Sequence, residues 1–74
     1  MASSAGDDAG ADVARLVEQA VELRERLRRN TVALALCEEA LADVFDRRAN
    51  REAAARARLT AQECRAFAAR LAAL

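Results

Sequence analysis

The 74-residue sequence has no histidine, proline, tryptophan or tyrosine, and it contains only two glycines, two cysteines and two phenylalanines. Without histidine, lysine, tyrosine or a glycine-rich loop, general acid–base catalysis and phosphate binding have no candidate residues. With only two cysteines, far apart in the sequence, a zinc site has too few ligands. We therefore expect a protein that is not an enzyme, with no cofactor, metal or small-molecule substrate.

Long hydrophobic runs are also missing. The longest, residues 32–37, has six residues, whereas a membrane-spanning helix needs about 20. The first thirty residues hold no apolar segment typical of a signal peptide. These features predict an intracellular protein, cytoplasmic or nuclear and not secreted, with Cys37 and Cys64 reduced.

Alanine dominates what is present, with 21 of the 74 residues, and charged residues make up 32%. Alanine favours helix, whereas strands need β-branched and aromatic residues, so the composition predicts an all-α fold. Residues 1–10 are small, polar and acidic, and we expect a disordered tail there. Residues 11–74 should form one helical module, with a first helix at about 11–46, capped by Asp12, and a second at about 51–74.

Apolar residues in the first predicted helix recur three and four positions apart, which is the spacing of a coiled-coil seam. Asn30 interrupts this seam. It is either a buried polar residue that restricts register, or part of a local break in which Thr31 caps the next segment. We expect the seam to form an interface with a partner through Leu16, Leu23, Leu27, Leu34, Leu41, Val44 and Phe45.

A second seam follows, displaced by two residues from the continuation of the first. The chain therefore either turns within residues 46–50 or continues as one long interrupted coiled-coil helix with two faces. Asn50 suits both a left-handed and a helix-capping position. In the hairpin, which we favour, the residues that close the two helices together are Phe67, Leu71 and Leu74.

Charge differs between the two halves of the chain. Residues 1–46 carry five arginines against ten acids, a net charge of −5, and residues 47–74 carry seven arginines against two acids, a net charge of +5. An antiparallel hairpin would place Glu38, Glu39 and Asp43 alongside Arg51, Arg56 and Arg58. An antiparallel homodimer of straight helices would gain the same complementarity between molecules.

Large apolar side chains are concentrated in the first helix. Residues 13–45 contain twelve leucines, valines and phenylalanines, and residues 46–74 contain four. The first helix thus offers more apolar surface than the second can cover, which predicts a non-catalytic subunit or adaptor in a larger helical assembly. The alternative is a self-associating coiled coil. A nucleic-acid-binding module ranks last, because acids interrupt its basic cluster of Arg47, Arg48, Arg51, Arg56 and Arg58.

Overall fold

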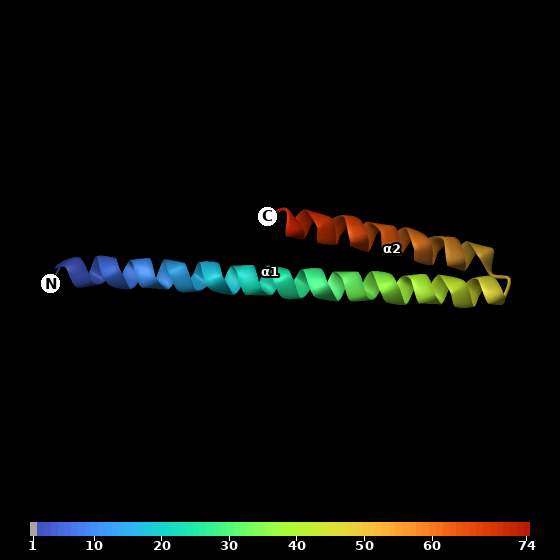
Figure 1. Ribbon diagram of the computed structural model, residues 1–74, viewed down its shortest axis with the longest axis horizontal. Helices are drawn as coiled ribbons and strands as arrows, with labels where there is room; N and C mark the ends of the chain where they lie inside the picture. The colour runs from blue at the N-terminus through green and yellow to red at the C-terminus, as the bar shows by residue number, and fades with distance from the viewer. Residues whose placement is uncertain (1) are drawn as a thin grey trace.

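The computed structural model describes the backbone of residues 2–74 and the side chains of residues 8–74. Two helices, α1 (Ala2–Arg47) and α2 (Arg51–Ala72), run antiparallel as a hairpin (Figure 1). The molecule is a rod with extents of 72 × 15 × 12 Å. The described backbone contains no strand. The expected all-α hairpin is confirmed, and the continuous helix is excluded.

Helix α1 extends further toward the N-terminus than the start expected near residue 11. Of the expected disordered tail, residues 8–10 continue α1, while Met1 and the side chains of residues 2–7 lie outside the described part. Asp12 therefore does not cap the helix, and its carboxylate instead accepts a 2.7 Å hydrogen bond from Arg15. Gly10 costs only about 1 kcal/mol relative to alanine, so it does not stop the helix.

The helix also continues through Asn30 and Thr31, so the local break considered there is wrong. The hydroxyl of Thr31 donates to the carbonyl oxygen of Leu27 at 2.7 Å, which satisfies it inside the helix instead of at a cap. Asn30 is exposed on the surface of the hairpin.

The turn between the helices lies where the sequence places it. Ala49 adopts the left-handed conformation with φ of 58°, and the Asn50 amide donates to the Phe45 carbonyl at 2.8 Å. Asn50 then caps α2, because its side-chain oxygen accepts from the amide of Ala53 at 3.2 Å. The sequence thus identifies the cap correctly, although alanine occupies the left-handed position.

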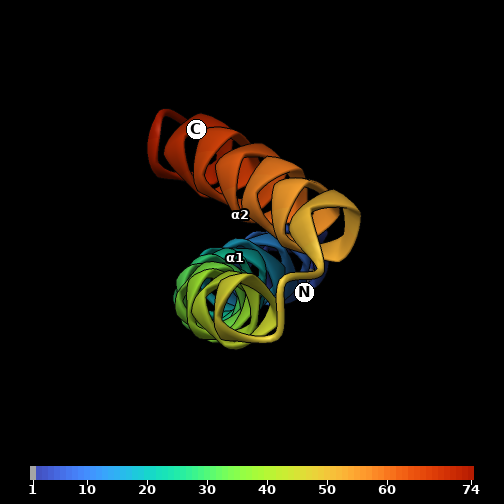
Figure 2. The same cartoon turned by 90° about the vertical axis from the view of Figure 1, so that its right-hand side faces the viewer.

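Alanine forms the contact between the helices. Its small side chain lets the two backbones approach closely along one line, which we call the alanine seam, and Figure 2 shows the resulting single pair of helices. Phe45 packs against the cluster of Ala42, Ala54 and Ala57 within this seam. The buried residues are Ala35, Ala42, Ala53, Ala54, Ala57, Ala61 and Ala68.

The two helices differ in length by a factor of two. At about 1.5 Å per residue, the 46 residues of α1 span about 69 Å and the 22 residues of α2 span about 33 Å. Helix α2 therefore covers only the C-terminal half of α1 (Figure 1). Residues 8–23, which we call the arm, are all exposed.

Candidate interaction surface

The leucines expected to form the seam lie beside the hairpin contact and not within it. Leu34 and Leu41 directly precede Ala35 and Ala42, which are fully buried against α2. Consecutive helical residues point about 100° apart, so the leucines turn away from α2. The resulting leucine face keeps 45–62% of each residue exposed and consists of Leu16, Leu23, Leu27, Leu34 and Leu41.

Helix α2 shows the same one-residue displacement. The sequence places Phe67 in the second seam, but the next residue, Ala68, is the buried one, and Phe67 remains 38% exposed. In both helices, the residue that directly precedes a buried seam residue points to one side of the seam. Because the helices are antiparallel, this is the same side of the hairpin for α1 and for α2. Phe67 therefore lies on the side of the leucine face, where Arg70 stacks over its ring at 5.6 Å.

The opposite side of the hairpin is charged. Asp43 and Arg58 each follow a buried alanine, and they form an ion pair at 3.6 Å. Arg58 also pairs with Asp46, and its hydrogen bond holds the pKa of Asp46 below the usual value and raises the pKa of Arg58. Arg65 donates to Glu39 at 2.8 Å. One edge of the hairpin, which we call the polar edge, therefore carries the ion pairs between the helices, and the other carries the leucine face. By the same one-residue displacement, Leu36 lies on the first edge, and the ion pair of Glu52 with Arg56 lies on the second.

This arrangement agrees in part with the ion pairs expected between the halves. Asp43 meets Arg58 as expected, whereas Glu39 meets Arg65, and Arg56 pairs at 3.5 Å with Glu52 of its own helix. The ion-pair partners differ from those expected because the alanine seam fixes which residues of the two helices lie opposite each other along the polar edge.

The remaining residues expected at the interfaces have different surroundings. Phe45 and Val44 are half-buried, and Phe45 belongs to the alanine seam instead of the leucine face. Of the three residues expected to close the hairpin, Leu71 is half-buried on the seam, but Leu74 is 79% exposed. The alanines that form the contact between the helices cannot be recognised from the sequence, because alanine is common along the whole chain.

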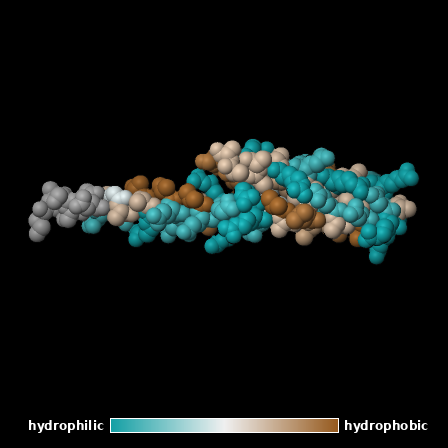
Figure 3. Space-filling view, viewed as in Figure 1, coloured by the Kyte–Doolittle hydropathy of each residue, from teal (hydrophilic) through white to brown (hydrophobic). Residues whose placement is uncertain are grey.

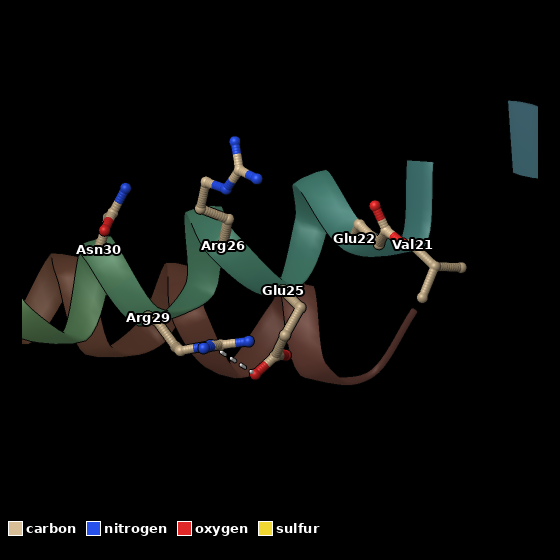
Figure 4. Close-up of a pocket in the computed structure, with 6 residues that line it drawn as sticks. All are labelled: Val21, Glu22, Glu25, Arg26, Arg29 and Asn30. Atoms are coloured by element: carbon tan, nitrogen blue, oxygen red, sulfur yellow. Dashed lines mark ion pairs between the residues drawn. The ribbon is translucent and has the colours of Figure 1, made fainter. Parts of the chain in front are cut away.

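A depression on α1 lacks the enclosure that a small-ligand site needs. This depression of about 500 Å³ is lined by the residues labelled in Figure 4, among which Glu25 pairs with Arg29 at 3.4 Å. All its lining residues come from one helix, which cannot enclose a molecule as ligand pockets do. Among residues with described side chains, no group of three possible metal ligands occurs. Cys37 is exposed and Cys64 half-buried, and both are free.

Apolar side chains reach the surface on the arm and again along the hairpin (Figure 3). Neither helix, within the described residues, has the length and apolar character needed to cross a membrane. In comparisons with family models, curated proteins and solved structures, none matched this chain.

Proposed function

We propose that this protein is a non-catalytic subunit that packs the leucine face of α1 against helices of a larger assembly. The single observation that carries the proposal is the series of five half-exposed leucines on one face of α1, from Leu16 to Leu41, which Asn30 interrupts once. This series is about 38 Å long at 1.5 Å per residue. Exposed apolar surface of this extent is typical of protein–protein interfaces.

The energetics favour an amphipathic helix as the occupant of this face. Full burial of a leucine side chain contributes about 2 kcal/mol, so covering each half-exposed leucine would contribute about 1 kcal/mol. The five leucines occupy heptad positions of a coiled-coil seam, and Ala20, Asn30 and Cys37 complete its spacing of three and four residues. A nucleic-acid partner is less well supported, since Arg58 and Arg65 of α2 are paired with acids of α1.

The experiment compares Leu34→Asp with Leu36→Asp. Both leucines lie on α1 and are about equally exposed, but Leu36 lies off the leucine face. Neither change touches the alanine seam, so circular dichroism should show both variants as helical as the wild type. We expect Leu34→Asp to abolish association, measured by sedimentation equilibrium and by co-purification from cells, and Leu36→Asp to preserve it. Equal behaviour of the two variants in both assays would refute the proposal.

A further inference from the structure

The arm carries part of the leucine face, and only its C-terminal end, at Val21, lies beside the last residues of α2. Leu16 and Leu23 are 62% and 58% exposed, against 45–48% for Leu27, Leu34 and Leu41 beside α2. The arm spans about 24 Å at 1.5 Å per residue, which is shorter than the roughly 33 Å of α2. Its occupant must therefore supply a helix of similar length together with a suitable charge.

Charge distinguishes between the possible occupants. The arm carries four acids and one arginine, a net charge of −3. Helix α2 carries five arginines and two acids, but Arg58 and Arg65 already pair with acids of α1 on the polar edge, which leaves α2 with a net charge of +1 toward a partner. A second copy lying parallel would place arm on arm and acid on acid. A second copy lying antiparallel places each acidic arm beside the hairpin of the other copy, next to its basic α2.

We propose that a second copy of this chain packs antiparallel on the leucine face, so that each end of the dimer is a three-helix bundle of one hairpin and the partner's arm. This inference rests on the proposed function and names the partner of the same surface. In this dimer the leucine face of each copy contacts the leucine face of the other, as a twofold-symmetric interface requires.

The heptad spacing specifies the register. Positions 13, 20, 27, 34 and 41 alternate with 16, 23, 30, 37 and 44, and in an antiparallel pair the first set meets the second. With residue 10 opposite residue 47, Leu16 meets the partner's Leu41, Leu23 meets the partner's Leu34, and the whole of α1 beyond Gly10 is used. A shift by one heptad toward the N-terminus would instead bring Glu25 of the two copies together at the twofold axis.

This register places Cys37 opposite the partner's Ala20. The two Cys37 residues then lie about 25 Å apart along the axis, at 1.5 Å per residue. A disulfide requires Cα atoms within about 7 Å. In a parallel dimer the two Cys37 residues would instead face each other. A cysteine introduced at position 20 therefore distinguishes the two orientations, because within one chain it is too far from Cys37 to react.

The experiment oxidises the full-length chain carrying Ala20→Cys with Cys64→Ala, after sedimentation equilibrium under reducing conditions. We expect a dimer before oxidation and a covalent dimer afterwards, with peptide mapping joining position 20 to Cys37. Two controls, Cys64→Ala alone and Ala14→Cys with Cys64→Ala, should form at least tenfold less covalent dimer. Ala14 is an exposed arm residue that lies off the leucine face.

Each other outcome overturns a defined part of the argument. A Cys37–Cys37 link, or equal cross-linking from positions 14 and 20, overturns the antiparallel register but leaves the leucine face as an interface. A chain that sediments as a monomer at 100 µM overturns the second copy as partner, and the proposed function then depends on co-purification. A dimer that persists unchanged in Leu34→Asp refutes the proposed function itself.

Discussion

The alanine seam makes a quantitative prediction at Ala42. This residue is fully buried against Ala54 and Ala57, whereas Ala40, two positions earlier on the same helix, is exposed. Ala42→Gly and Ala40→Gly remove the same methyl group from the interior of the same helix. Comparing them separates the packing contribution of the methyl group from the helix propensity of alanine.

The expected magnitudes follow from the two contributions. Replacing alanine by glycine inside a helix costs about 1 kcal/mol in propensity at either position. Removing a buried carbon costs about a further 0.8 kcal/mol, and this applies only at Ala42. We therefore expect the free energy of unfolding to fall by about 2 kcal/mol in Ala42→Gly and by about 1 kcal/mol in Ala40→Gly.

Urea unfolding followed by circular dichroism at 222 nm measures both values, with protein concentration varied so that association is separated from hairpin stability. Leu41→Ala completes the comparison, because a seam through Leu41 would make it the most damaging of the three changes. If Leu41→Ala destabilised the hairpin by more than Ala42→Gly, or if the two glycine variants were equally stable, the alanine seam would be the wrong contact.

Three further predictions concern the turn and the polar edge of the hairpin. Ala49→Gly should raise the free energy of unfolding by about 1 kcal/mol, because glycine adopts a positive φ without the steric cost that alanine bears; a lower urea midpoint would contradict this. Asn50→Ala should lower stability by about 1 kcal/mol, since the amide of Ala53 loses its capping acceptor, whereas Asn50→Asp should retain most of the cap. Thermal midpoints recorded from pH 7 to pH 2 should show that Arg58→Gln destabilises the wild type at neutral pH and that this difference disappears at low pH. The pKa of Asp46 is lowered in the folded chain by its hydrogen bond from Arg58, so the stabilisation is complete above about pH 4 and is lost as the pH falls through the lowered folded pKa; a difference that stayed constant with pH would refute the role of this pair.

Several features of the fold follow from the sequence because they depend on local interactions. The lack of proline, the abundance of alanine and the three-and-four spacing are sufficient to predict helices. The turn at residues 46–50 is one of the two arrangements that the displaced second seam allows, and Asn50 favours it because its side chain caps a helix from within three residues. The attraction between an acidic and a basic half favours the hairpin, and Asp43 and Arg58 do meet across it.

The sequence misplaces the boundary of α1 because the cost of one glycine is small compared with the propensity of the alanines around it. It also leaves open the role of Asn30, since a polar residue in an apolar series is consistent with either a break or a buried contact. In the structure the helix continues through both residues: Asn30 is exposed, and the Thr31 hydroxyl donates to the Leu27 carbonyl within the helix.

What the sequence by itself determined is that the chain is helical and that large apolar residues are concentrated in its first half; it favoured a hairpin over one continuous helix, and the structure decided between them. Only the tertiary structure decided which side of each helix faces the other. Hydrophobicity alone favours Leu34 and Leu41 in the contact, but the pair closes on Ala35 and Ala42 one position later, with Asp43, Glu39, Arg58 and Arg65 pairing along its polar edge. The physical reason is that small side chains let the helix axes approach while charged neighbours pair across the edge. The leucines are thereby left as a separate face for another helix.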